Sequence, residues 1–108
     1  MSADVYEHTI QVKLEHMDEM NHVNNVVYLQ WTQDAAYAHW MSKAPPALRN
    51  QYKWVVLKHE IVYNSPAFLQ QELVVKTWVY DYSGAKSTRV VQIVRKSDNK
   101  LLAEARTL

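Results

Sequence analysis

One stretch of this sequence, from Val26 to about Met41, can form a long helix, and it lies between strand-like segments. No proline or glycine interrupts it, and residues recur at the three- and four-residue spacing that gives a helix one packing face. These residues are Leu29, Thr32, Ala36, His39 and Trp40. The pair Pro45-Pro46 prevents the helix from continuing. A single helix among strands must be buried by a sheet that wraps around it, which is an α+β architecture.

The segments on both sides of the helix have the alternation and β-prone composition of strands. Before the helix, a strand is predicted over Thr9–Glu15, with Ile10, Val12 and Leu14 on one side. After a connecting segment at Ala44–Lys53, strands are predicted at Trp54–Tyr63, Glu72–Tyr82, Ser87–Arg95 and Leu101–Leu108. The turns between them are predicted at residues 64–67, 83–84 and 97–100. We expect the first two of these later strands to be neighbours in the sheet.

Length and composition indicate one domain covering residues 1–108. Twelve Lys and Arg against eleven Asp and Glu leave a formal charge of +1, so no strong field favours nucleic acid. No apolar run is long enough to cross a membrane, and the N-terminus lacks a signal sequence. We therefore expect a cytoplasmic protein without a nucleic-acid or membrane partner. The absence of cysteine excludes disulfides and a cysteine nucleophile, and the single glycine, Gly84, excludes a Gly-rich phosphate loop.

The polar segment from His16 to Asn25 carries the residues best suited to chemistry. Asn24 and Asn25 are both good N-cap residues, so a helix should begin beside them. The first-turn N–H groups and the positive end of the helix dipole can hold an oxygen that becomes negative in a reaction. A loop can bring the Asp18 carboxylate to the same place, although most aspartates at strand ends only cap a loop, so the residues alone favour that role for Asp18.

These residues resemble a known active-site segment. Met17-Asp18, His22-Val23-Asn24-Asn25 and Tyr28-Leu29 are similar to the corresponding residues of hotdog-fold acyl-CoA thioesterases of the 4-hydroxybenzoyl-CoA type, and of plant acyl-acyl-carrier-protein thioesterases. The resemblance continues through Tyr63 and Pro66-Ala67 and covers most of the chain. It implies a hotdog fold, in which a curved antiparallel sheet wraps one central helix. It also implies hydrolysis of an acyl-CoA to a free acid and coenzyme A, an activity of lipid metabolism.

The resemblance assigns catalytic roles to Asp18, His22 and Asn25. Asp18 matches the family's catalytic aspartate, which either attacks the carbonyl or activates water, and the Asn25 backbone N–H matches the oxyanion donor. His22 either orients water or the thioester, or fixes the loop. Asn24 either contacts substrate or caps the helix. Asp34 is a rival acid, because some hotdog thioesterases take theirs from the helix; we interpret it instead as a polar helix position near a subunit interface.

Substrate contacts are predicted at two further places. Tyr28 can line an acyl pocket, although at helical spacing such a residue is more often core. Lys86, Ser87 and Arg89 can meet the phosphates of coenzyme A, with Arg95-Lys96 at the other end of the same strand; the alternative is a solvated strand end. No His, Asp or Glu residues have the spacing of a metal site, so we expect neither metal nor cofactor.

Three features depart from the family pattern. Asn21 stands where relatives usually have glycine before the histidine, and Asn accepts the left-handed conformation that would preserve the loop's path. His16 stands where a second acidic residue is common, which removes a nearby like charge from Asp18. The chain stops at Leu108, earlier than its relatives, so we expect a shortened last strand.

A lone hotdog subunit leaves a sheet edge unpaired, and by resemblance it supplies only part of the acyl-CoA cleft. We therefore expect a homodimer or homotetramer, in which strands of one subunit bring Lys86 or Arg89 to the acyl-CoA held near Asp18 of the other. Other functions stay open at this point. They are hydrolysis of acyl-carrier-protein thioesters, hydration or dehydration by a hotdog enoyl hydratase or dehydratase, and non-catalytic acyl-CoA binding.

Overall fold

The structure is a computed structural model that describes residues 5–43, 57–83 and 86–108, except the side chains of residues 81–83 and 86. Strand β1 (Tyr6–Gln11) is followed by a 3-10 turn (Leu14–His16) and helix α1 (Asn25–Lys43). Four more strands follow, namely β2 (His59–Tyr63), β3 (Glu72–Ser83), β4 (Lys86–Arg95) and β5 (Lys100–Thr107). The predicted connection at Ala44–Lys53, the first residues of the strand predicted at Trp54–Tyr63, and Gly84 lie outside the described residues.

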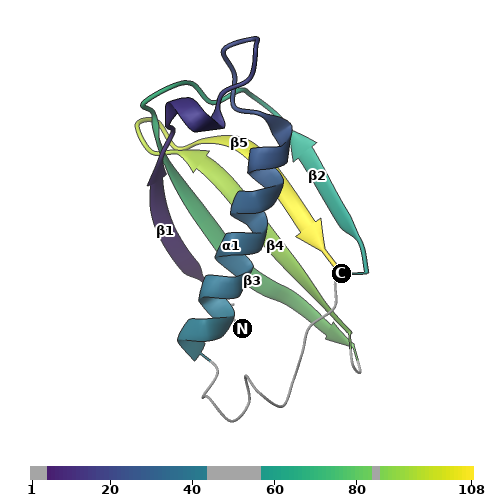
Figure 1. Ribbon diagram of the computed structural model, residues 1–108. Coiled ribbons are helices and arrows are strands. Elements are labelled where there is room, and N and C mark those ends of the chain that lie inside the picture. The colour runs from purple at the N-terminus through teal and green to yellow at the C-terminus, as the bar shows by residue number, and fades with distance from the viewer. Residues whose placement is uncertain (1–4, 44–56, 84–85) are drawn as a thin grey trace.

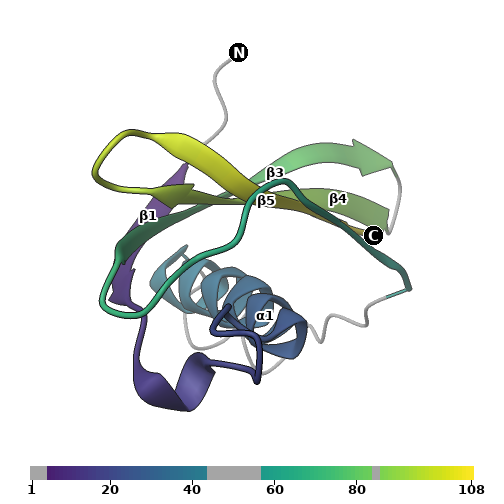
Figure 2. The same ribbon diagram turned by 90° about the horizontal axis from the view of Figure 1, so that it is seen from above.

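The five strands form one open antiparallel sheet in the order β1-β3-β4-β5-β2. Helix α1 lies along one face of this curved sheet (Figure 1), and the view along the helix shows the sheet arching over it (Figure 2). The predicted α+β hotdog fold is confirmed. None of the helices in the described part of the chain is both long and apolar enough to span a membrane.

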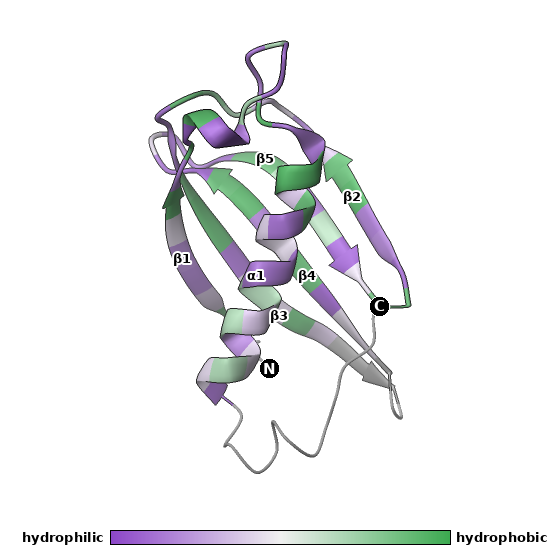
Figure 3. Ribbon diagram, in the orientation of Figure 1, coloured by the Kyte–Doolittle hydropathy of each residue, from purple (hydrophilic) through white to green (hydrophobic). Residues whose placement is uncertain are grey.

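The core lies between the helix and the concave face of the sheet. Successive strand residues point to opposite faces, so alternate residues of β3, β4 and β5 face the helix. Leu73 and Val75 are fully buried, as predicted, while Val79 on the same face is half-buried. Their core partners across the sheet are Val91, Ile93, Ala103 and Ala105. The alternation of apolar and polar residues is visible along the strands (Figure 3). Each large buried side chain contributes roughly 1.5–3 kcal/mol.

The buried face of the helix is shifted by about one position toward the N-terminus from the face that the sequence predicts. The buried residues are Tyr28, Trp31, Thr32, Ala35 and His39, whereas Leu29, Ala36 and Trp40 are half-buried. Aromatic rings reach the curved sheet near the helix start, and Ala35, with no exposed surface, allows close approach at the centre. The prediction was therefore right about the spacing and partly wrong about the face.

The first strand begins and ends earlier than the predicted Thr9–Glu15. Val12 is buried, but Leu14 is 77% exposed, so the prediction that Leu14 shares the buried side is wrong. The chain leaves the sheet here because the Lys13 N–H donates to His16 Nδ1 at 2.9 Å and the His16 N–H donates to the Lys13 carbonyl at 2.9 Å. Such local bonds compete with a strand ladder and favour a turn.

The predicted pairing of the two strands after the helix is also wrong. β2 pairs with β5 at one edge of the sheet, while β3 lies between β1 and β4. Residues 64–71, which we call the crossover segment, must therefore pass over the end of the sheet instead of forming a hairpin. The Asn64 and Ser65 N–H groups donate to the Leu102 carbonyl, and the Gln70 N–H donates to the Val12 carbonyl. These long-range bonds have no signature in the local sequence.

Candidate active site

Asp18 closes the loop that precedes the helix. Its Oδ1 accepts hydrogen bonds from the N–H groups of Met20, at 2.9 Å, and His22, at 3.1 Å. Its own N–H donates to the His22 carbonyl at 2.8 Å. The turn places Asn21 at φ 60°, the left-handed conformation predicted for it. The loop thus engages Oδ1 with backbone donors, and among the described residues none donates to Oδ2.

Hydrogen bonds of Asn24 define the start of the helix. Asn24 is the N-cap, because its Oδ1 accepts from the Val26 N–H at 3.0 Å and its carbonyl accepts from the Val27 N–H at 2.9 Å. The Asn24 N–H donates to the His16 carbonyl. No acceptor among the described residues takes the Asn25 N–H. A free donor therefore stands at the positive end of the α1 dipole.

A pocket of about 370 Å³ joins the loop, the helix start and the crossover segment. It is lined by Asp18, Met20, His22, Val23, Asn25, Tyr28, Tyr63, Asn64, Ser65 and Pro66. The structure therefore brings the three predicted catalytic residues, Asp18, His22 and Asn25, to one pocket of the size that binds small ligands. Asn24 caps the helix beside it.

Tyr28 belongs to both the core and the pocket wall. It is 3% exposed, and its hydroxyl accepts a hydrogen bond from the Ala67 N–H at 3.1 Å. Burial raises the pKa of the Tyr28 hydroxyl, so it stays protonated near neutral pH. Its ring meets that of Tyr63 at 5.4 Å, and the Tyr63 hydroxyl lies 3.4 Å from the Asn25 carbonyl. The two tyrosines thus hold the crossover segment against the helix start.

Most of the pocket residues that the sequence does not predict as site residues come from the end of β2 and the crossover segment. They are Tyr63, the last residue of β2, and Asn64, Ser65 and Pro66, and the Asp18 loop adds Met20 and Val23. In the sequence, Tyr63 and Pro66 are indicated only by the resemblance. That signal was available, but without the strand order nothing in the sequence places this segment beside the helix.

The predicted phosphate contacts lie far from Asp18 within one chain. Lys86 and Ser87 begin β4 at the end of the sheet opposite the Asp18 loop (Figure 1). The side chain of Lys86 lies outside the described residues. Arg89 is half-buried under the helix, where its Nη1 lies 2.9 Å from His39 Nδ1 and donates to Thr77 Oγ1 at 3.0 Å.

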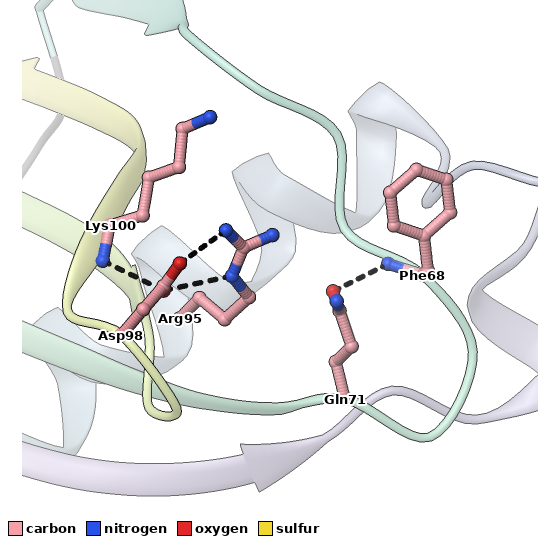
Figure 4. Close-up of polar contacts among 5 residues, drawn as sticks. All are labelled: Phe68, Gln71, Arg95, Asp98 and Lys100. Atoms are coloured by element: carbon pink, nitrogen blue, oxygen red, sulfur yellow. Dashed lines mark hydrogen bonds and ion pairs between the residues drawn. The ribbon is translucent and has the colours of Figure 1, made fainter.

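The other charged candidates are engaged elsewhere. Asp34 is exposed, outside the pocket lining, and accepts a hydrogen bond from the Gln30 amide at 2.8 Å. Arg95 forms a bidentate pair with Asp98 in the β4–β5 turn (Figure 4). This arginine lowers the pKa of the Asp98 carboxyl to about 2. Lys96 Nζ lies 3.2 Å from Glu72 Oε2. Among the described residues no three His, Asp or Glu side chains are grouped to hold a metal ion.

Solved structures similar to this one include several thioesterases. A 1,4-dihydroxy-2-naphthoyl-CoA thioesterase from Synechocystis is 21% identical, with a TM-score of 0.80 over 96% of this chain and 79% of that chain. A probable thioesterase from Escherichia coli is 23% identical, with a TM-score of 0.81 over 94% and 77%. A Thermus thermophilus thioesterase complexed with coenzyme A and Zn is 20% identical, with a TM-score of 0.81 over 94% and 74%. At these identities the likeness shows the shared fold.

The family comparison covers most of the sequence. No curated protein sequence matches the chain significantly. The family model of the thioesterase-like superfamily, in contrast, matches residues 12–108, which include the Asp18 loop, the helix and all later strands. The chain therefore belongs to the thioesterase-like superfamily, which confirms the prediction of a hotdog-fold thioester hydrolase.

Proposed function

We propose that this protein is an acyl-CoA thioesterase, which uses water to convert an acyl-CoA into a carboxylic acid and coenzyme A. One observation carries the proposal: Asp18 and Asn25, whose N–H has no acceptor among the described residues, line the same pocket. Thioester hydrolysis needs this combination of a carboxylate that attacks or activates water and a donor for the developing oxyanion. The Thermus thermophilus thioesterase of the same fold is complexed with coenzyme A, which supports coenzyme A as the acyl carrier here.

The groups divide the reaction between them. The thioester carbonyl oxygen accepts from the Asn25 N–H, where the α1 dipole stabilises the negative charge that develops. Asp18 Oδ2 then either attacks the carbonyl carbon or takes a proton from a water molecule that attacks it. In both routes the carbon–sulfur bond breaks, the thiol of coenzyme A leaves with a proton, and the acyl carbon finally carries an oxygen from water. His22, beside Asp18, orients the water or the thioester.

We further propose that the working unit is a homodimer, or a homotetramer built from such dimers. No Lys or Arg is among the described residues that line the pocket, so the phosphates of coenzyme A need cations from elsewhere. β1 and β2 are the edges of the described sheet, and unpaired edges favour pairing with a second copy. Lys86 and Ser87 of a second subunit are our candidates for these phosphates. Arg89 has less freedom to join them, because of its contacts with His39 and Thr77.

The test is release of free thiol from a panel of acyl-CoAs of different chain length and polarity, with acyl-carrier-protein thioesters in parallel. Enoyl-CoA hydration and acyl-CoA binding are measured on the same preparation. The proposal expects thiol release in proportion to enzyme and no hydration. Hydration of enoyl-CoA would point to a lyase, and saturable binding without thiol release would point to a binding protein. We also propose a cytoplasmic location and a role in lipid metabolism, both of which are compatible with an acyl-CoA substrate.

A further inference from the structure

The imidazole of His22 packs against the ring of Phe68 in the crossover segment. The two ring centroids lie 5.4 Å apart with an interplanar angle of 81°, an edge-to-face arrangement. No described residue is hydrogen-bonded to either ring nitrogen of His22, so both nitrogens remain available to substrate or water. The backbone of His22 is held separately, by the two hydrogen bonds to Asp18.

Phe68 is itself placed by a tight turn. Its N–H donates to Gln71 Oε1 at 2.9 Å (Figure 4), and the Gln71 N–H donates to its carbonyl at 3.2 Å. Between them Gln70 adopts φ 68°, a left-handed conformation that is uncommon for a residue with a long side chain. Such conformations persist where the surroundings fix them, and they cluster at functional sites.

Ala67, the residue before Phe68, is hydrogen-bonded to the site through both its carbonyl and its N–H. The Ala67 carbonyl accepts from the Val23 N–H at 3.2 Å, and its N–H donates to the Tyr28 hydroxyl at 3.1 Å. Ala67 has no exposed surface, so neither bond can be replaced by water without opening the structure. Phe68 is therefore held at a fixed place next to His22, although 42% of its own surface is exposed.

We propose that Phe68 is a positioning residue for the reaction: its ring limits the rotation of the His22 imidazole, so that the ring nitrogens stay directed at water or the thioester. This inference rests on the proposed thioesterase function. Phe68 does not line the pocket, and it acts through His22. A residue that only orients a group for the transition state affects kcat more than KM.

The kinetic test compares Phe68→Ala with Leu69→Ala, which removes an adjacent apolar side chain of similar exposure, 45% against 42%. Phe68→Ala should lower kcat by about two- to tenfold, the range of an edge-to-face pair, with KM little changed. Phe68→Tyr, which keeps the ring, should restore kcat, and Leu69→Ala should leave it unchanged. In a His22→Ala background, Phe68→Ala should cause no further loss of kcat. The proposal is overturned if Phe68→Ala lowers kcat by the same factor in the His22→Ala background as in the wild type. It is also overturned if Leu69→Ala lowers kcat as much as Phe68→Ala does.

A second readout does not depend on turnover. The ring-proton resonances of His22 carry the ring-current shift of Phe68, so they should move in Phe68→Ala and stay in place in Leu69→Ala. Unmoved resonances in Phe68→Ala would show that the rings are not in contact and would overturn the proposal. If the wild type releases no thiol while the resonances move as expected, the thioesterase function fails and the positioning of His22 stands.

Discussion

Asp18 and His22 hold each other's backbone, because Asp18 Oδ1 accepts from the His22 N–H at 3.1 Å and the Asp18 N–H donates to the His22 carbonyl at 2.8 Å. Asp18 thus shapes the loop through hydrogen bonds to Oδ1, and the same residue also lines the pocket. This separation allows the structural and chemical roles of Asp18 to be tested with different substitutions.

Asp18→Ala should destabilise the protein by about 1–2 kcal/mol, because the N–H groups of Met20 and His22 lose their shared acceptor. Asp18→Asn keeps an oxygen acceptor at the same place, so it should destabilise the protein by only a small fraction of that amount. Chemical denaturation of the three proteins measures the difference. Equal destabilisation by both substitutions would mean that the charge of Asp18, and not its hydrogen bonds, holds the loop.

Asn25→Pro should remove the proposed oxyanion donor while keeping the helix. Proline has no N–H and is well tolerated at the first helical position, and N-cap residues generally have the extended backbone that a following proline favours. We expect kcat to fall by about 100- to 1000-fold, the usual effect of losing one such donor. The control is Asn25→Ala, which loses the side chain and keeps the N–H. If the two variants have the same kcat, the Asn25 N–H is not the donor.

Stability should decrease as the pH falls below about 6.5, in part because of His8. Burial lowers the pKa of the His8 imidazole, against the opposing effect of the Asp34 carboxylate, and its Nδ1 is buried without a hydrogen-bond partner in the described structure. The unfolded chain therefore binds the proton more readily than the folded one, and acid favours unfolding. His8→Phe should reduce the loss of unfolding free energy between pH 7 and pH 5. An unchanged pH slope would show that other groups cause it.

Activity should depend on subunit association. If each pocket uses cations from a second chain, dilution below the dimer dissociation constant should abolish turnover while the helix and sheet stay folded. Sedimentation, circular dichroism and thiol release at matched concentrations provide the measurement. A monomer that is fully active at its assay concentration contradicts the shared site.

The sequence predicted elements whose signals are local. The helix followed from an uninterrupted three- and four-residue spacing, and the left-handed backbone of Asn21 followed from its place in a loop where relatives have glycine. The predicted catalytic residues lie in one pocket because Asp18, His22 and Asn25 belong to one continuous segment. Their roles in the reaction stay predictions.

The features that were missed depend on contacts between distant segments. The pairing of β2 with β5 is set by register and core packing across the whole sheet, and no turn residue encodes it. The crossover segment follows from that strand order, and with it the pocket wall at Tyr63 and the contact of Phe68 with His22. Leu14 was misplaced for a local reason, because the hydrogen bond from Lys13 to His16 ended the strand before the apolar alternation did.

The catalytic role of Asp18 is tested most directly by thiol release from acyl-CoA by Asp18→Asn compared with the wild type. Asparagine keeps an oxygen for the loop's hydrogen bonds and removes the carboxylate that attacks the carbonyl or activates water. We predict that the wild type releases thiol and that Asp18→Asn, folded and able to bind the acyl-CoA, loses at least about 100-fold in kcat. Full activity in Asp18→Asn, or no hydrolysis of any acyl-CoA by the wild type, would contradict it.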